Sequence, residues 1–241
     1  MPRARPGPEP RLRRIAWSRA TRIIASRYPP VDLYERVSAD PSVWDALIAA
    51  EQLVNPRIRD DAGDIRLVPP AERVSGAGAT NVMAPFTHLN PKGSRFSDGS
   101  YGVYYAGREF ETALRETAYH FARFAEDSSD GPRFEDMHVL VGAIANRFHD
   151  VATLSASRQR TILNPDSYVE SRRFGAAMRE SGSNGLVYRS VRHAGGHCVA
   201  AFRPKAVAIP MQTRHLKYHW DGTRVVRYFD YESDRWIAIE T

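Results

Sequence analysis

Three side chains with different chemistry occur close together near the middle of the 241-residue chain. Arg95 lies in a loop rich in glycine, serine and aspartate, Tyr105 in the aromatic run that follows, and Glu116 further along. A guanidinium binds phosphate oxygens, a phenol offers a ring face and a hydroxyl, and a carboxylate stabilises developing positive charge. These groups could therefore form one site if the local structure brings them together.

A strand followed directly by a helix would position them. The sequence predicts a strand at Tyr101–Ala106, in which period-two alternation turns Tyr105 to the same face as its strand neighbours. A helix is expected to follow at once, because acidic and short polar residues fill its first turn. Glu116 and His120 fall together on one flank of this helix. The apolar stripe lies elsewhere on it and comprises Leu114, Ala118, Phe121 and Ala125.

The same residues allow a plainer interpretation. An arginine in a loop, a tyrosine in a strand and a glutamate on a helix flank are ordinary surface residues, and Glu116 with His120 fits a simple i,i+4 pair. Ser190, near the end of another predicted strand, fits an edge hydroxyl, because no His–Asp pair lies near it in the sequence. Spacing alone leaves both interpretations open.

The composition is that of a globular protein, with 42% hydrophobic and 26% charged residues. The single cysteine, Cys198, excludes a disulfide framework and is typical of a reducing compartment. No apolar run approaches the roughly 20 residues that cross a bilayer, and the start of the chain lacks the apolar core of a secretory signal. We therefore expect a soluble cytoplasmic protein that does not bind membranes.

The positive charge is concentrated at the start of the chain. Residues 1–27 hold eight arginines against Glu9, a net +7, so the remaining residues sum to −1 although the whole chain carries +6. With four prolines in the first ten residues, we interpret residues 1–30 as a basic, partly disordered arm and residues 31–241 as the catalytic domain. Such an arm binds nucleic acid weakly through phosphates or is only a solvated tail.

The other predicted elements alternate between strands and helices, which favours one α+β domain without repeats. No regular structure is predicted for residues 57–92, which are rich in glycine, proline and aspartate. The capping-box pattern Ser167-Tyr168-Val169-Glu170 predicts a helix that starts at Asp166 or Ser167. The remaining predictions are a helix at Ser42–Glu51, strands at Val31–Val37, His138–Ile144 and Ala206–Ile209, a hairpin of Leu186–Val191 with His197–Phe202, and a hairpin around Asp221-Gly222.

Two histidine pairs with four-residue spacing, His193 with His197 and His215 with His219, raise the question of a metal site. Two glycines interrupt the first pair, and the second lies in a predicted strand, where residues four apart are about 13 Å distant. No carboxylate pattern such as H-E-x-x-H accompanies them, so we expect no metal. The sequence also lacks the glycine-rich patterns of P-loop and Rossmann nucleotide sites.

A set of short motifs resembles the RES-domain family, which is named for an arginine, a glutamate and a serine. The motifs are Arg95-Phe96, Val103-Tyr104-Tyr105-Ala106, Thr112-Ala113-Leu114-Arg115-Glu116, Gly185-Leu186-Val187-Tyr188-Arg189-Ser190 and Gly195-Gly196, in the family's order. The resemblance spans roughly residues 31–204. Two departures are evident: Gly93-Ser94-Arg95-Phe96-Ser97 replaces the common Gly-Gly-Arg-Trp-Asn, and an asparagine usual after the late glycines is absent around His197-Cys198.

The resemblance implies a fold similar to ADP-ribosylating toxins, with a mixed or antiparallel β core and flanking helices. It implies four catalytic residues, Glu116, Arg95, Tyr105 and Ser190. It also implies that Arg36, in the first predicted strand, binds substrate together with Arg95, Tyr105 and Ser190.

The family's members are bacterial toxins that destroy NAD+, so the resemblance implies cleavage of the nicotinamide–ribose bond. NAD+ is then the substrate and no cofactor is needed. Water or inorganic phosphate is the acceptor, and the protein partner is an antitoxin of the Xre-like helix-turn-helix class. A homodimer stays open, and contact with nucleic acid is expected only weakly, through the arm or through the antitoxin. Two alternatives are an ADP-ribosyltransferase acting on a protein or nucleic acid and a non-catalytic nucleic-acid-binding module.

Overall fold

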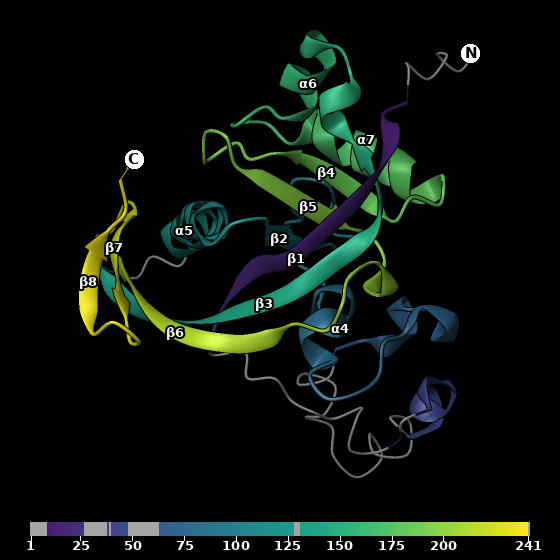
Figure 1. The fold of residues 1–241 in the computed structure, drawn as a ribbon, viewed down its shortest axis with the longest axis horizontal. Helices are drawn as coiled ribbons and strands as arrows, with labels where there is room; N and C mark the ends of the chain where they lie inside the picture. Colours follow the sequence, from purple (N-terminus) through teal and green to yellow (C-terminus); the bar gives the residue numbers. More distant parts are fainter. Residues whose placement is uncertain (1–8, 27–37, 39, 48–62, 128–130, 241) are drawn as a thin grey trace.

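The computed structural model describes residues 9–26, 38, 40–47, 63–127 and 131–240. Within these residues, eight strands form one mixed sheet in the order β1-β2-β5-β4-β3-β6-β7-β8. Helices flank the sheet, so the predicted α+β class is confirmed (Figure 1). No helix in the described ranges is long and apolar enough to span a bilayer.

The two longest strands, β1 (Arg11–Ala25) and β3 (Arg133–Asp150), pair antiparallel and cross the whole molecule (Figure 1). β1 also contacts β2 (Tyr104–Gly107), which pairs with β5 (His197–Ala201). β5 pairs with β4 (Gly185–Arg189), and β4 in turn forms a short parallel pairing with β3. The pairings thus close a ring of five strands, β1, β2, β5, β4 and β3.

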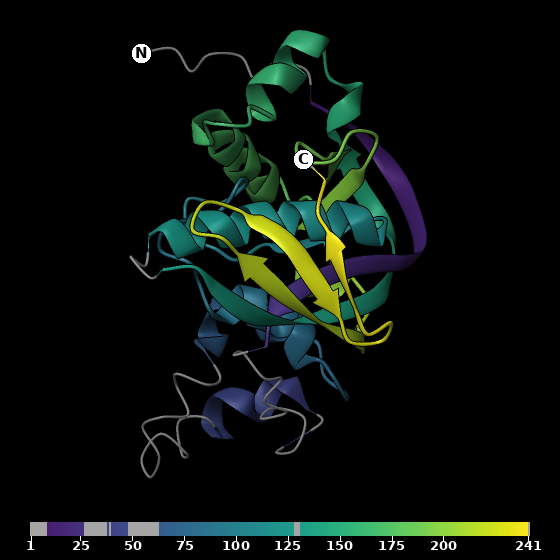
Figure 2. The ribbon, with the colours of Figure 1, turned by 90° about the vertical axis from the view of Figure 1, so that its left-hand side faces the viewer.

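The C-terminal strands extend the sheet from the other half of β3. β6 (Met211–Trp220), β7 (Val225–Asp230) and β8 (Arg235–Ala238) follow one another as antiparallel neighbours. They curve over the helix α5 (Phe110–Glu126), in front of which they lie in Figure 2. One apolar cluster, which includes Leu114, Phe121, Leu216 and Tyr218, fills the space between α5 and these strands.

The remaining helices lie at two other places. α6 (Ala156–Ile162) and α7 (Val169–Glu180) lie beside the β4–β5 hairpin, whereas α4 (Thr80–Thr87) lies on the opposite side of the β1–β3 pair (Figure 1). The short 3-10 turns are η1 (Pro41–Val43), η2 (Ile65–Leu67), η3 (Pro70–Glu72), η4 (Val151–Thr153) and η5 (Pro204–Ala206).

The predicted strand-to-helix junction is confirmed, although the strand begins at Tyr104 and not at Tyr101. Helix α5 starts three residues after the end of β2, with Glu109 as its N-cap residue. Gly107 makes this close approach possible, because a Cβ there would come within 2.7 Å of the Ala113 nitrogen. All four residues of the predicted apolar stripe are buried, as amphipathic periodicity requires.

The domain division at residue 30 is wrong for the part of the arm that the structure describes. Residues 11–25 form β1 and pair with β3 along nearly its whole length. Ile15, Ala20 and Ile23 are buried between the exposed arginines, so the high charge belongs to the outer positions of a core strand. Residues 1–8 and 27–30 lie outside the described residues.

Three further sequence predictions need correction, and one helix was missed. Residues 57–92 contain helix α4 besides two 3-10 turns, and α6 was not predicted. The predicted strand at 206–209 is irregular after η5. Ser167 does not cap α7, because Tyr168 is its N-cap and makes no side-chain capping bond.

Both predicted hairpins are present, and the strand predicted at 138–144 is part of β3. The helix predicted at 42–51 begins with η1 and is helical through residue 47. The strand predicted at 31–37, and with it Arg36, lies outside the described residues.

Candidate functional site

Glu116 lies on the flank of α5 that faces the loop after β4, and its side chain is 15% exposed. Its Oε1 accepts a hydrogen bond from Ser190 Oγ at 2.6 Å and another from the Val191 nitrogen at 3.1 Å. The other oxygen, Oε2, lies 3.9 Å from His120 Nε2. The carboxylate is therefore held by the loop through one oxygen, while the second oxygen bears no such bond to the loop.

Ser190 is the centre of a tight turn. Besides donating to Glu116, its hydroxyl oxygen accepts hydrogen bonds from the backbone nitrogens of Arg192 and His193, at 3.2 and 2.9 Å. Ser190 therefore positions the carboxylate and shapes the loop that approaches it.

The same loop is fastened to the first turn of α5. Thr112, which is fully buried, shares a 2.9 Å hydrogen bond between its Oγ1 and His193 Nδ1. Gly196 packs against this contact so closely that a Cβ would lie 2.5 Å from Thr112 Oγ1. His193, considered above as half of a metal pair, thus holds the loop against the helix.

Tyr105 connects β2 to the loop that carries Arg95. Its hydroxyl shares a 2.8 Å hydrogen bond with Ser94 Oγ and accepts one from the Phe96 nitrogen at 3.1 Å. Burial raises the pKa of the Tyr105 phenol to about 12, so the hydroxyl is neutral at physiological pH. Both neighbours of Arg95 are therefore bound to one phenol.

Arg95 is 3% exposed, although it carries a charge. Its Nη1 donates to the Asn164 carbonyl at 2.9 Å, and its guanidinium lies 4.5 Å from the ring centre of Tyr168. Nη2 is buried and has no hydrogen-bond partner among the described residues. A buried, unpaired guanidinium nitrogen is costly in a folded protein unless a ligand or water satisfies it.

Arg192, two residues after Ser190, is a candidate that the sequence analysis missed. Its Nη2 donates to the Pro165 carbonyl at 2.6 Å, and its guanidinium lies 3.4 Å from the ring centre of Tyr119. Its Nε is also buried without a partner in the described part of the chain. The signal available in the sequence was its place in the same short loop as Ser190.

Three titratable groups near Glu116 have pKa values shifted toward their neutral forms. Burial, with the nearby Glu116 charge, raises the pKa of the Cys198 thiol, whose sulfur lies 4.0 Å from Glu116 Oε1. Burial likewise raises the pKa of Tyr188 well above its usual value. The pKa of His120 is lowered, chiefly by desolvation, although Glu116 acts in the opposite direction. These three groups are therefore uncharged at neutral pH.

The structure brings Arg95, Tyr105, Glu116 and Ser190 into one region, since the first three act on the same phenol, Tyr188, and Ser190 bonds Glu116. Their catalytic role stays a prediction. Arg36 was predicted to belong with them and lies outside the described residues. Among the described residues, no group of three or more His, Cys, Asp or Glu side chains could hold a metal ion.

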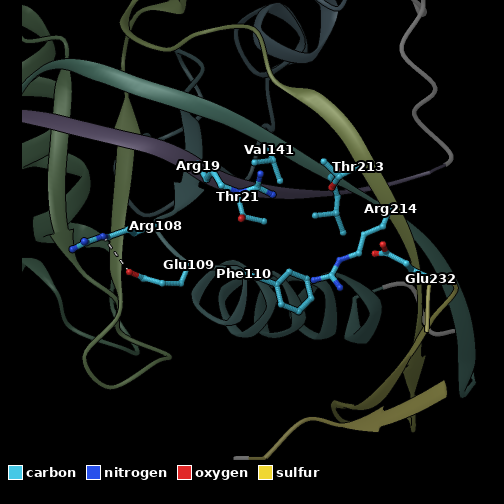
Figure 3. A pocket seen from close by; sticks show the side chains of 10 residues that line it. Arg19, Thr21, Arg108, Glu109, Phe110, Val141, Thr213, Arg214 and Glu232 are labelled. Atoms are coloured by element: carbon cyan, nitrogen blue, oxygen red, sulfur yellow. Dashed lines mark hydrogen bonds and ion pairs between the residues drawn. The ribbon is translucent and has the colours of Figure 1, made fainter. Parts of the chain in front are cut away.

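A separate cavity of about 500 Å³ lies at the N-terminus of α5, between β1 and β6 (Figure 3). Arg19, Arg108 and Arg214 line it, but two of them already pair with acids. Arg108 contacts Glu109 at 3.2 Å, and Arg214 contacts Asp230 at 3.1 Å. Its charges are largely compensated, in contrast to those of Arg95 and Arg192.

Comparison with known proteins identifies the family. The RES domain family profile matches residues 70–221, more than half of the chain. The chain belongs to the RES domain family. The match covers Arg95, Tyr105, Glu116 and Ser190, but it begins well after Arg36 and extends beyond the residues 31–204 expected above.

Two individual proteins are also similar to this RES domain protein. One is the uncharacterized protein y4oC of Sinorhizobium fredii (strain NBRC 101917 / NGR234), 31% identical over 210 residues, which cover 85% of this chain and 84% of that protein. The other is a chain of the M. tuberculosis MbcT–MbcA toxin–antitoxin complex, 10% identical, with 87% of each chain covered and a TM-score of 0.35. A likeness at that level carries no argument about function.

Proposed function

We propose that this RES domain protein cleaves NAD+ at the bond between nicotinamide and ribose. The observation that carries the proposal is the position of Glu116, whose Oε1 is held by Ser190 and Val191. Its charge and that of the buried Arg95 both act on His120, and Arg95 Nη2 has no partner among the described residues. A carboxylate beside an anion-binding group fits a substrate that becomes positively charged near a pyrophosphate. Membership of the RES family supports the same activity.

Glu116 would act on the transition state. As the bond between C1 of the ribose and the nicotinamide nitrogen breaks, its electron pair goes to the pyridinium ring, which leaves as neutral nicotinamide. The ribose then carries oxocarbenium-like positive charge, as in glycoside hydrolysis. A carboxylate fixed beforehand stabilises this charge without having to reorganise. Because the leaving group becomes neutral by itself, the reaction needs little acid catalysis.

The other residues would bind and position. Arg95 offers its free Nη2 to a pyrophosphate oxygen, because guanidinium groups form charge-assisted bonds with phosphate. Tyr105 holds the loop of Arg95 through its hydroxyl, and Ser190 holds Glu116. Arg36, as a second substrate-binding arginine, rests on the sequence resemblance alone.

The acceptor would be water or inorganic phosphate. Attack by water on C1 gives ADP-ribose and releases one proton, whereas attack by a phosphate oxygen gives ADP-ribose carrying a phosphate on C1. In either reaction NAD+ is the substrate, and no cofactor is consumed. Family membership further supports an antitoxin of the Xre-like class as the partner that restrains the toxin in the cytoplasm.

The test is incubation of the purified full-length chain with NAD+, with and without inorganic phosphate, followed by mass analysis of the products. Free nicotinamide with ADP-ribose or its 1-phosphate supports the proposal and identifies the acceptor. Nicotinamide released together with ADP-ribose attached to a protein or nucleic acid would instead identify an ADP-ribosyltransferase. Folded protein that leaves NAD+ intact under all conditions would overturn the proposal and favour a non-catalytic module.

A further inference from the structure

We propose that Arg95 and Arg192 together form a binding site for one phosphate group beside Glu116. This inference deepens the proposed function, since it assigns a second anion-binding arginine to the same site. It rests on the contacts of the two guanidinium groups and does not require that NAD+ be cleaved.

The two arginines are held by neighbouring carbonyls of one loop. Arg95 Nη1 donates to the Asn164 carbonyl, and Arg192 Nη2 donates to the carbonyl of Pro165, the next residue. This loop connects α6 to α7, whereas Arg95 precedes β2 and Arg192 follows β4. Segments distant in the sequence therefore place the two cations at consecutive carbonyls of one loop.

Each guanidinium is also fixed by an aromatic ring. Arg95 lies over Tyr168, and Arg192 lies over Tyr119 in α5. Stacking on an aromatic face and a bond to a carbonyl leave the planar groups little freedom, so their other nitrogens point in set directions. Such preorganisation lowers the cost of binding a ligand.

No acidic side chain in the described ranges is bonded directly to either guanidinium. Neither arginine forms an ion pair with an acidic side chain among the described residues, whereas nearby Arg173 pairs with Glu170 at 2.8 Å. Arg95 Nη2 and Arg192 Nε are both buried without a hydrogen-bond partner in the described ranges. Desolvation is the main cause of the lowered pKa of His120, and the positive charges of Arg95 and Arg192 lower it further. Two nearby like charges, each with an unused donor, fit an anionic ligand that satisfies both.

A phosphate group matches this arrangement. Its several oxygens can accept from two guanidinium groups at once, and charge-assisted bonds of this type are among the strongest in proteins. The phosphate could belong to the pyrophosphate of a dinucleotide or could be free inorganic phosphate that serves as acceptor. The chemistry of recognition is the same in both cases, so binding experiments must separate the two sources.

The experiment measures binding by isothermal titration calorimetry with three probes: inorganic phosphate, ADP-ribose and nicotinamide riboside, which carries no phosphate. Arg192→Gln removes the charge and the terminal guanidinium while it keeps a polar, though shorter, side chain. We expect about tenfold or greater loss of affinity for the phosphate-containing probe that occupies the site, with little change for nicotinamide riboside. Loss confined to inorganic phosphate identifies the acceptor site, and loss confined to ADP-ribose identifies the pyrophosphate site.

Arg173→Gln, on the exposed surface of α7, serves as the matched control and should bind all probes like the wild type. Arg192→Lys keeps the charge but loses the planar fork, and it should fall between wild type and Arg192→Gln. It also provides a second variant if Arg192→Gln fails to fold, as judged by circular dichroism. Unchanged affinity of a folded Arg192 variant for both phosphate probes would overturn the inference. Phosphate binding that depends on Arg192 in a protein that does not cleave NAD+ would uphold the site and refute the proposed function.

Discussion

The substitution Glu116→Gln separates the charge of this side chain from its contacts. The amide oxygen of glutamine can accept the bonds from Ser190 Oγ and the Val191 nitrogen, which lie at 2.6 and 3.1 Å in the wild type. The amide nitrogen then takes the place of Oε2 near His120, where no short contact has to be kept. Folding should therefore survive, and the main loss is the negative charge that, in the proposed reaction, faces the ribose.

Loss of one preorganised electrostatic group typically lowers kcat by about 10²-fold or more. Since the charge matters most when the ribose becomes cationic, KM for NAD+ should change far less than kcat. Nicotinamide release, followed by chromatography, gives both constants. Glu111→Gln is the matched control, because Glu111 lies on the same helix and, among the described residues, its ion pair is with Arg115 at 2.6 Å. Near-wild-type turnover by folded Glu116→Gln would remove the carboxylate from the mechanism.

Three further predictions follow from the same structure. Ser190→Ala removes the bond that fixes Glu116, so we expect kcat to fall about tenfold or more, with intact folding by circular dichroism; unchanged kcat would show that Ser190 does not position the carboxylate. Deletion of residues 1–20 removes much of β1, including the buried Ile15, and should abolish the cooperative thermal transition, whereas deletion of residues 1–8 should preserve it; a cooperative melt of the longer deletion would contradict the role of β1. The folded pKa values of His120, His138 and His149 are all lowered, so the unfolded chain binds more protons and stability should fall as the pH drops below about 6.5; a melting temperature independent of pH from 7 to 5 would contradict this.

Local periodicity was enough to predict the parts of the site that lie on one continuous segment. The helix of Glu116 is strongly amphipathic, and its N-terminus follows a short aromatic strand, so both elements could be placed from neighbouring residues. The hairpin that ends next to Ser190 was predictable for the same reason, because glycines separate two apolar runs.

β1 was missed because its composition and its pattern point to different structures. Exposed arginines at 11, 13, 14 and 19 made the segment resemble a solvated tail, yet the buried residues between them pack into the two main apolar clusters. The net charge summed over residues 1–27 does not show this alternation of exposed and buried positions. A strand buried on one face can carry many charges on the other.

The role of Arg192 could not be read from spacing, because it depends on the Pro165 carbonyl and on the ring of Tyr119. These partners lie 27 and 73 residues away, so only the folded chain brings them together. The same holds for Thr112 and His193, whose contact joins the serine loop to the helix. In the sequence, the four-residue spacing of that histidine from His197 had only raised the question of a metal site.

The strand first interpreted as part of an arm also supports the arginine of the site. Arg22 in β1 donates from Nη1 to the Tyr105 carbonyl at 3.0 Å, and its guanidinium lies over the ring of Tyr104. Tyr105 in turn binds the Phe96 nitrogen through its hydroxyl, which fixes the backbone next to Arg95. A continuous series of contacts thus runs from the basic N-terminal segment to the backbone beside Arg95. The arginines of this segment therefore differ in role: those exposed on β1 contribute charge, whereas the half-buried Arg22 contributes to the position of the loop on which substrate binding would depend.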